Sequence, residues 1–308
     1  YIFYKALRDN NVTDAFIYSG GSVMPLIDGL YKSEINYYVN SHEQNCGHAA
    51  TGYAKISDKT GVCIVTSGPG ITNMITPLLD AKNDSTPLIV FSGQVSQNVQ
   101  GTNAFQEAPA IELTKHVTKW NYQIKDINEM YDVIKEGFRI ANDGKKGSVH
   151  IDIPKCVSYQ SIDANYNNIE QTSHKLKSDN LHNHLILNQN NIKMITDLIN
   201  KSQKPIIYLG QGCINSVMEL REFAINGNIP VTSTIHGTGI MDEHHKLSLR
   251  WCGTHGFAPA NYTLQEADLI IALGSRFDDR TTGNISEYAP KAFEAGKEGK
   301  GGIIHVNI

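Results

Sequence analysis

The sequence predicts an α/β protein built from two doubly wound parallel-sheet domains. Short apolar stretches alternate with helix-like stretches along most of the 308 residues, as in parallel strands joined by crossover helices. This alternation stops between residues 158 and 191, where Ser, Asn, Gln, His and Asp dominate, and then resumes. We therefore predict a first domain over residues 1–157, a linker over 158–191 and a second domain over 192–308.

In the first domain the short apolar stretches predict strands over 15–18, 37–39, 62–65, 88–91 and 149–153. Helical periodicity between them predicts helices over 23–31, 47–56, 71–82 and 127–141. Ser-Gly-Gly, His-Glu, Ser-Gly-Pro-Gly and Ser-Gly-Gln segments follow four of these strands directly. Because the carboxyl ends of parallel strands meet at one edge of a sheet, we expect these segments to come together there.

The second domain repeats the pattern with predicted strands over 205–209, 230–235, 269–273 and 303–308 and a helix over 218–225. The first residues of the chain already resemble the interior of an amphipathic helix, and the last predicted strand stops without a turn. We therefore expect this sequence to be a piece of a longer protein.

Composition argues against several classes of function. A net charge of −4 and a pI near 6.3, with no Lys/Arg cluster, argue against a nucleic-acid-binding surface. No apolar run approaches the roughly 20 residues that span a bilayer, which argues against a membrane protein. The five cysteines are scattered without metal-ligand spacing, so we expect reduced thiols in an intracellular protein and no metal site in this chain.

Glu43 lies where a predicted strand gives way to a helix rich in small residues. A carboxyl group packed at such a place is poorly hydrated, so it can hold or share a proton near neutral pH. The alternative is a glutamate at the start of a helix, stabilised by the helix dipole. From these residues alone both interpretations stay open.

Several segments in one order resemble the pyrimidine-binding domain of thiamine-diphosphate enzymes, and most closely that of the acetolactate synthase (acetohydroxyacid synthase) large catalytic subunit family. They are Tyr18-Ser19-Gly20-Gly21-Ser22, His42-Glu43-Gln44, Val65-Thr66-Ser67-Gly68-Pro69-Gly70, Phe91-Ser92-Gly93-Gln94-Val95 and Gly101-Thr102-Asn103-Ala104-Phe105-Gln106-Glu107. A later segment, Gly274-Ser275-Arg276-Phe277-Asp278-Asp279-Arg280, resembles the FAD-binding domain of the same family. The resemblance covers nearly the whole chain, and the ordered motifs are far more specific together than singly.

The resemblance implies that Glu43 hydrogen-bonds the pyrimidine ring of thiamine diphosphate and favours the tautomer whose nitrogen acts as a base. It makes Glu43, Gln106 and Gly21 catalytic. It places six residues against thiamine diphosphate: Tyr18, Gly20, Glu43, Pro69, Asn73 and Gln106. It places Ser22, Ser96 and Phe105 along the approach of the substrate.

Gly-rich or charged segments also follow the predicted strands of the second domain. Glycines and backbone amides suit a diphosphate, but none of these segments is a Gly-x-Gly-x-x-Gly fingerprint, so the fold alone leaves FAD open. The resemblance assigns FAD contacts to Lys145, Gly210, Gln211, Gly212, Thr234, His255, Gly256, Gly274, Ser275, Arg276, Asp278 and Arg280. At Lys145 the family carries an arginine, and a lysine lacks the bidentate fork.

The activity implied by the resemblance is decarboxylation of pyruvate and its ligation to a second 2-keto acid, pyruvate or 2-ketobutyrate. The products are 2-acetolactate or 2-aceto-2-hydroxybutyrate, on the route to valine, leucine and isoleucine. The resemblance also implies Mg²⁺, with ligands in a C-terminal diphosphate-binding domain absent from this chain, so we expect the 308 residues alone to be inactive. It implies a homodimer or homotetramer with the active site between subunits, a possible regulatory small subunit, and a mitochondrial or plastid location in a eukaryote or a cytoplasmic one otherwise.

Two alternatives remain. One is another FAD-containing relative of the pyruvate oxidase or glyoxylate carboligase type, although glyoxylate carboligase characteristically lacks a glutamate at the Glu43 position. The other is a non-catalytic scaffold of the thiamine-enzyme type. The intact Glu43, Gln106 and glycine turns argue against such a scaffold.

Overall fold

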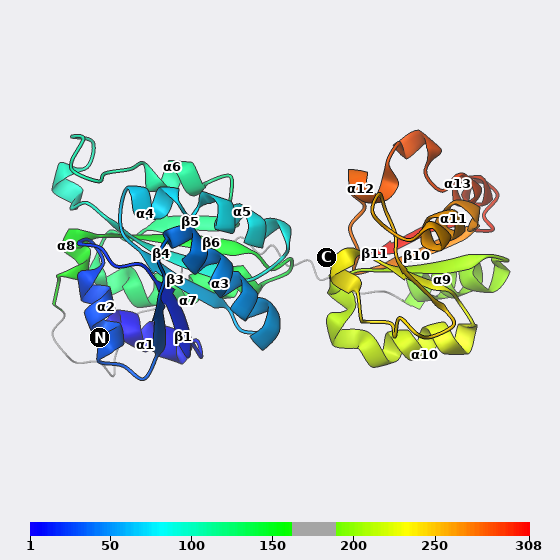
Figure 1. Cartoon of the computed structure of the whole chain (residues 1–308), viewed down its shortest axis with the longest axis horizontal. Coiled ribbons are helices and arrows are strands. Elements are labelled where there is room, and N and C mark those ends of the chain that lie inside the picture. The colour runs from blue at the N-terminus through cyan, green and yellow to red at the C-terminus, as the bar shows by residue number, and fades with distance from the viewer. Residues whose placement is uncertain (162–188) are drawn as a thin grey trace. The chain divides into compact units, whose positions relative to one another are not determined.

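The computed structural model describes residues 1–161 and 189–308 (Figure 1). The chain divides into two compact units, Tyr1–His182 and Asn183–Ile308, and each contains a parallel sheet with helices packed on it. The predicted fold class is therefore confirmed. Within the described ranges, no helix combines the length and the apolar character that crossing a bilayer would require.

The first unit contains a six-stranded sheet in the order β2-β1-β3-β4-β6-β5, and every neighbouring pair is parallel. Its strands are β1 (Asp14–Ile17), β2 (Asn36–Val39), β3 (Gly61–Val65), β4 (Leu88–Gln94), β5 (Trp120–Gln123) and β6 (Ser148–Pro154). The strand order reverses between β1 and β3, because β2 lies on one side of β1 and all later strands lie on the other.

Helices cover both faces of this sheet (Figure 1). They are α1 (Ile2–Asp9), α2 (Met24–Tyr31), α3 (Glu43–Ser57), α4 (Pro69–Thr72), α5 (Ile75–Asn83), α6 (Ala110–Thr114), α7 (Met130–Asn142) and α8 (Lys155–Ser158), with 3₁₀ turns η1 (Gln97–Val99) and η2 (Ile127–Glu129). Alternate residues of β3 point to opposite faces of the sheet and pack against the helices on each face. Val62 and Ile64 pack with α1, α2 and α7, whereas Cys63 and Val65 pack with α3 and α5.

The second unit contains five parallel strands in the order β11-β10-β7-β8-β9. They are β7 (Pro205–Leu209), β8 (Val231–Ser233), β9 (Ser248–Trp251), β10 (Leu269–Leu273) and β11 (Gly302–Val306). The helical elements are α9 (Gln189–Lys201), η4 (Gln211–Ser216), α10 (Val217–Gly227), η5 (Ile235–Gly237), α11 (Ala258–Glu266), α12 (Asp279–Thr282), η6 (Ile285–Glu287) and α13 (Pro290–Lys297). Here the strand order reverses between β7 and β10.

The structure corrects several predicted elements. Strands β5 and β9 were not predicted, because their half-exposed residues form no apolar run. The helix predicted over 71–82 is two helices, α4 and α5, separated at Asn73 and Met74. Helix α9 begins at Gln189, inside the predicted linker. The rest of that linker, residues 162–188, lies outside the described residues.

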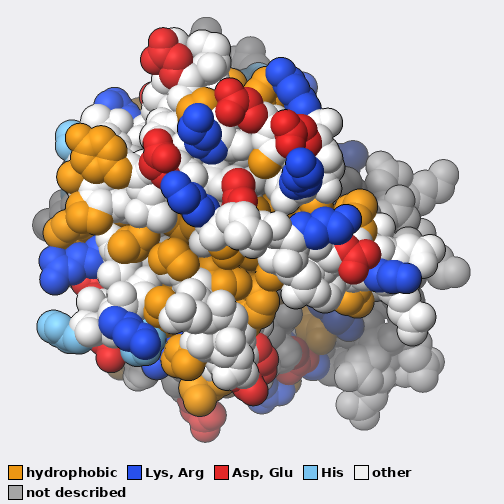
Figure 2. All heavy atoms as spheres, turned by 90° about the vertical axis from the view of Figure 1, so that its right-hand side faces the viewer, with side chains coloured by type: hydrophobic (Ala, Val, Ile, Leu, Met, Phe, Trp, Pro, Cys, Tyr) orange, Lys and Arg blue, Asp and Glu red, His pale blue; other side chains and the backbone are white. Residues whose placement is uncertain are grey.

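One face of the molecule is shown as spheres in Figure 2. Basic and acidic side chains are interspersed on this face, with hydrophobic side chains gathered between them. This face therefore presents no continuous basic stretch of the kind that follows a nucleic-acid backbone.

Three glycines allow the loops after β7 and β10 to touch. A Cβ placed on Gly210 would lie 2.3 Å from the Gly274 carbonyl oxygen, and one placed on Gly274 would lie 2.7 Å from the backbone of Gly212. The Gly212 amide donates to the Gly274 carbonyl at 3.0 Å. Side chains at these positions would separate the two strands at the point where the strand order reverses.

A polar network is buried between β4, β5, β6 and α6. Ser92 on β4 bridges two groups on β6, because its hydroxyl lies 2.8 Å from His150 Nε2 and donates to Asp152 Oδ1 at 2.5 Å. Asp152 Oδ2 also accepts from Gln123 Nε2 at 2.8 Å and from Gln94 Nε2 at 3.3 Å. Both His150 and Asp152 are fully buried, so every polar atom they carry depends on such partners.

Burial shifts the two titratable groups in opposite directions. It raises the pKa of Asp152 to about 6, although hydrogen bonds from Ser92, Gln123 and Gln94 oppose the rise. It lowers the pKa of His150 to about 3. As pH rises from about 4 to 6, the folded chain keeps a proton on Asp152 that the unfolded chain releases, so this group reduces stability. His150 has the opposite effect on stability. Between about pH 6.5 and pH 3 the unfolded chain protonates this histidine and the folded chain does not, so stability falls as pH falls.

Asp152→Asn should therefore make the stability of the first unit more sensitive to acid, because the opposing effect of His150 remains. Between pH 7 and pH 5 we expect the variant to lose on the order of 1 kcal/mol more than the wild type. Urea unfolding followed by Trp120 fluorescence, in a Trp251→Phe background, measures this. Parallel stability profiles for the two proteins would contradict it.

Gly274→Ala should destabilise the second unit more than Gly283→Ala. Both glycines have a positive φ, of 55° and 57°, but a Cβ on Gly283 meets nothing within 4 Å. We expect a loss of about 1 kcal/mol at Gly283 from the backbone alone and about 3 kcal/mol at Gly274, where overpacking adds to it. Urea unfolding followed by Trp251 fluorescence in a Trp120→Phe background gives both values, and equal losses would refute the packing role of Gly274.

Candidate active site

The predicted thiamine-site segments lie at the carboxyl edge of the first sheet. Tyr18 follows β1, Glu43 begins the helix after β2, and Pro69 begins the helix after β3. The loop that contains Gln106 follows β4 and η1. The structure thus brings the predicted segments to the edge where the strand order reverses between β1 and β3, which is the usual position of a ligand site in such sheets.

Gly20 and Gly21 play different parts at this edge. A Cβ on Gly20 would lie 2.3 Å from the Thr66 Cβ, so Gly20 is needed for the loops after β1 and β3 to touch. A Cβ on Gly21 would meet nothing within 4 Å. Ser22 reinforces the contact between the loops, since its hydroxyl lies 2.9 Å from Thr66 Oγ1 and accepts from the Ser67 amide at 3.0 Å. Of these residues, only Gly21 faces open space.

The carboxylate of Glu43 is held by Asn73. Glu43 is the first residue of α3 and is 6% exposed, and its Oε2 accepts from Asn73 Nδ2 at 2.9 Å. Within residues 1–161 and 189–308 this is the one hydrogen bond to that carboxylate, so Oε1 is left to bond a ligand. The predicted contact of Asn73 with the cofactor is therefore joined by a second task, which is to orient Glu43.

Two neighbours complete the surroundings of Glu43. His42 caps α3, and its Nδ1 accepts from the Gln44 amide at 3.1 Å. Cys46 lies one turn further along the helix and is buried. Burial, and secondarily the charge of Glu43, raise the pKa of the Cys46 thiol to about 11, so it remains a neutral thiol at physiological pH.

The loop that contains Gln106 packs on the Gly68-Pro69 turn. A Cβ on Gly68 would lie 2.7 Å from the Gln106 carbonyl oxygen, so the two backbones are in direct contact. Gln106 itself is left-handed, with φ of 59°. Glu107 closes the loop, because its carboxylate accepts from the Gly101 amide at 2.5 Å and from the Ala104 amide at 3.0 Å.

The remaining first-unit predictions lie around this loop. Phe105 is 88% exposed at its tip, and Ser96 is half-buried at the start of η1. Ser22 is buried, with its hydroxyl in the hydrogen bonds to Thr66 and Ser67, so it forms part of the floor of the site and not of an open approach.

The donor set of this edge suits one end of thiamine diphosphate. A dry carboxylate with an available oxygen fits a pyrimidine ring nitrogen, and the open position at Gly21 leaves room for a ligand. In the described part of the chain, no group of three or more His, Cys, Asp or Glu side chains could hold a metal ion.

The predicted FAD residues of the second unit also meet at a carboxyl edge. Gly210, Gln211 and Gly212 follow β7, Thr234 follows β8, His255 and Gly256 follow β9, and Gly274, Ser275, Arg276, Asp278 and Arg280 follow β10. The glycines 210, 212 and 274 contact one another, so they bring strands together instead of leaving a cradle at those positions. Gly256 likewise packs on the backbone of Cys252, within 2.4 Å of an added Cβ.

Two guanidinium groups lie at this edge, each beside an aspartate of the same loop. The Arg276 side chain is 60% exposed and lies 3.5 Å from Asp278, and the Arg280 side chain is 74% exposed. Burial raises the pKa of Asp278, but hydrogen bonds from Thr281 and the charge of Arg276 outweigh it and lower that pKa overall. Exposed guanidiniums beside turn amides suit a phosphate-bearing ligand.

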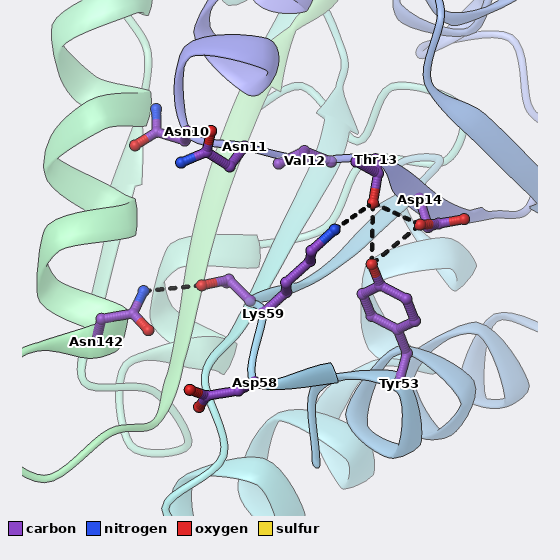
Figure 3. Close-up of a pocket in the computed structure, with 10 residues that line it drawn as sticks. Asn10, Asn11, Val12, Thr13, Asp14, Tyr53, Asp58, Lys59 and Asn142 are labelled. Atoms are coloured by element: carbon purple, nitrogen blue, oxygen red, sulfur yellow. Dashed lines mark hydrogen bonds between the residues drawn. The ribbon is translucent and has the colours of Figure 1, made fainter. Parts of the chain in front are cut away.

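Lys145 lies in the first unit, in the turn between α7 and β6, at the amino edge of that sheet. A pocket of about 220 Å³ opens at this edge (Figure 3). In it, Lys59 donates to Thr13, and Tyr53 donates to Asp14. These polar groups bond one another and tie α3 to β1, far along the strands from Glu43.

Sequence reasoning did not single out the supporting residues Thr66 and Gln94 within their motifs, and it missed His150 and Asp152 altogether. Thr66 gives no signal of its own, because its contact with Gly20 depends on the fold. The polar pair His150 and Asp152 inside the otherwise apolar strand 149–153 was a visible signal of a buried network.

Comparison with known proteins agrees with this arrangement. Residues 1–113 match the family described as thiamine pyrophosphate enzyme, N-terminal TPP binding domain, and residues 192–308 match the thiamine pyrophosphate enzyme central domain. The chain is 42% identical to the mitochondrial acetolactate synthase catalytic subunit of Saccharomyces cerevisiae, over 100% of this chain and 45% of that protein. It is 37% identical to the chloroplastic acetolactate synthase of Arabidopsis thaliana, over 100% of this chain and 46% of that protein.

The acetolactate synthase large subunit of Corynebacterium glutamicum is 39% identical, over 99% of this chain and 47% of that protein. The chain thus spans less than half the length of these relatives. The two family matches together cover more than half of the chain; the first contains strands β1 to β4 of the first sheet, and the second contains all five strands of the second sheet. The chain therefore belongs to the thiamine pyrophosphate enzyme family and carries the family's N-terminal TPP-binding domain and central domain.

Proposed function

We propose that this chain forms the pyrimidine-binding and central part of an acetolactate synthase. Such an enzyme decarboxylates pyruvate and ligates the product to pyruvate or 2-ketobutyrate. The observation that carries the proposal is the buried Glu43 carboxylate, oriented by Asn73 and with one oxygen available at the edge where β1 and β3 diverge. The similarity to acetolactate synthases from yeast, a plant and a bacterium supports the choice of reaction.

In this proposal, several site residues of the first unit have separate tasks. Glu43 shares a proton with the pyrimidine ring nitrogen, and Asn73 fixes the direction of its carboxyl group. Gly21 leaves room for the ligand, and Tyr18 and Pro69 flank it on the neighbouring loops. Gln106 and Phe105 approach from the loop after β4 and meet the substrate. When bound, thiamine diphosphate supplies the electron sink for decarboxylation and carbon–carbon bond formation.

The remaining parts of the proposal concern cofactors and assembly. We place FAD at the carboxyl edge of the second unit, with Arg276 as its main charged contact, and Mg²⁺ on residues outside this chain. A homodimer or homotetramer would complete the site, and the word subunit in the names of two relatives supports a regulatory partner. In a eukaryote we propose a mitochondrion or plastid, because the yeast and plant relatives are named mitochondrial and chloroplastic. Otherwise we propose the cytoplasm.

The reaction is tested by supplying the full-length protein with pyruvate, thiamine diphosphate, Mg²⁺ and FAD and measuring acetolactate. We expect acetolactate from the wild type and at least about 100-fold less from Glu43→Gln, the scale of positioned acid–base effects. A wild-type protein that binds thiamine diphosphate but converts pyruvate to acetate or acetaldehyde alone would refute the assigned reaction.

Asn73→Leu should weaken catalysis, because it removes the amide that orients Glu43 together with the predicted contact of that amide with the cofactor. It deletes the hydrogen bond that orients the buried Glu43 carboxyl group, so we expect turnover to fall by about 10- to 100-fold. Asn45→Leu is the matched control, because Asn45 is an exposed asparagine on the same helix as Glu43. Steady-state acetolactate formation measures both variants, and equal effects would show that the contact between Asn73 and Glu43 does no catalytic work.

A further inference from the structure

The buried network described above reaches the loop that contains Gln106 through one side-chain amide. Gln94, at the end of β4, is 3% exposed. Its Nε2 donates both to Asp152 Oδ2 at 3.3 Å and to the Ala108 carbonyl oxygen at 3.0 Å. Its Oε1 accepts from the Val95 amide at 2.9 Å, which fixes the direction of the amide. A buried carboxylate on β6 is thus linked to a loop carbonyl two residues after Gln106.

A second branch of the same network holds the helix that follows the loop. His150 Nδ1 lies 2.9 Å from the Thr114 hydroxyl on α6. Asn121 on β5 donates to that hydroxyl at 2.9 Å and to the Ile111 carbonyl at 2.6 Å. The segment is therefore tied to the sheet through the backbone at Ala108 and Ile111 and through the side chain of Thr114.

The loop needs such ties because Gln106 is left-handed. A non-glycine residue with φ of 59° costs about 1–2 kcal/mol, so its surroundings must impose that conformation. Glu107 closes the loop internally, but its hydrogen bonds reach only Gly101 and Ala104 in the same loop. Attachment to the sheet has to come from elsewhere, and the bond from Gln94 to Ala108 is the nearest described one after Gln106 along the chain.

Burying a carboxylate in the core costs desolvation free energy. Apolar residues of similar volume are often as stable as a buried charged network, or more so. Here the carboxylate orients the amide that holds Ala108, so the buried charge has a geometric consequence at the edge of the sheet. We propose that Asp152 and Gln94 are positioning residues: they hold the Ala108 carbonyl and thereby fix Gln106 over the Gly68-Pro69 turn. The effect of this positioning on catalysis rests on the proposed function, but the positioning of Gln106 itself does not.

The chain offers a matched control at Gln123. Its Nε2 donates to the same Asp152 oxygen as Gln94 does, at 2.8 Å, but it comes from β5 and has no hydrogen bond to the loop in the described residues. Gln94→Met and Gln123→Met each remove one hydrogen bond from Asp152. Only the first also removes the bond to Ala108.

Hydrogen exchange of the full-length protein, read by mass spectrometry on peptides covering residues 98–109, separates the two variants. Gln94→Met should speed exchange of this segment by about tenfold, the equivalent of one lost hydrogen bond, and Gln123→Met by less than about twofold. Peptides covering α3 should be unchanged in both. Equal acceleration in the two variants, or none in Gln94→Met, would overturn the proposal.

Gln94→Asn gives the same test with a milder change, should Gln94→Met fail to fold. Its amide is one methylene shorter, so it cannot bridge Asp152 and Ala108 together, and fast exchange of 98–109 is again expected. A kinetic measurement adds the catalytic consequence: acetolactate formation should fall in Gln94→Asn, while Gln123→Met stays near the wild type. If exchange responds but neither variant alters turnover, the positioning stands and the catalytic role of Gln106 fails.

Discussion

Each sheet reverses its strand order beside a glycine that has no room for a side chain. In the first unit Gly20 touches Thr66, and in the second Gly210 touches Gly274, with 2.3 Å to an added Cβ in each case. These contacts close the two diverging loops at the point where ligands bind in doubly wound sheets. The positions of Glu43, the Gly68-Pro69 turn and Arg276 all follow from strands that meet in this way.

The first unit combines a buried carboxyl group at this edge of the sheet with a polar network in its interior. Glu43 is buried at the start of α3 and held by Asn73, so one carboxylate oxygen has a fixed direction and the other is available. Behind it, Asp152 and His150 form a buried network that ends on the loop containing Gln106. Electrostatic preorganisation of this kind is costly in stability and useful in catalysis, because the groups need not reorganise during the reaction.

Sequence patterns predicted the parallel sheets, the carboxyl edge and the residues that line it, because strand periodicity and Gly-rich strand ends are local signals. They did not predict β5 or the tie from Gln94 to Ala108, since the half-exposed residues of β5 form no apolar run and hydrogen-bond partners distant in sequence leave no local trace. The glycines 210, 212 and 274 stay predicted ligand contacts, and the sequence did not show that they also pack against one another. Lys145 stands where the family carries an arginine, and it lies at the amino edge of the first sheet, which sequence order alone could not show.

The central claim is that Glu43 activates bound thiamine diphosphate through its available carboxylate oxygen. Deuterium exchange at C2 of the cofactor, measured on the full-length protein with the cofactor bound and no pyruvate present, tests it directly. In Glu43→Gln the exchange should slow by at least about 100-fold at unchanged occupancy. Exchange at the wild-type rate with the cofactor bound would contradict the claim.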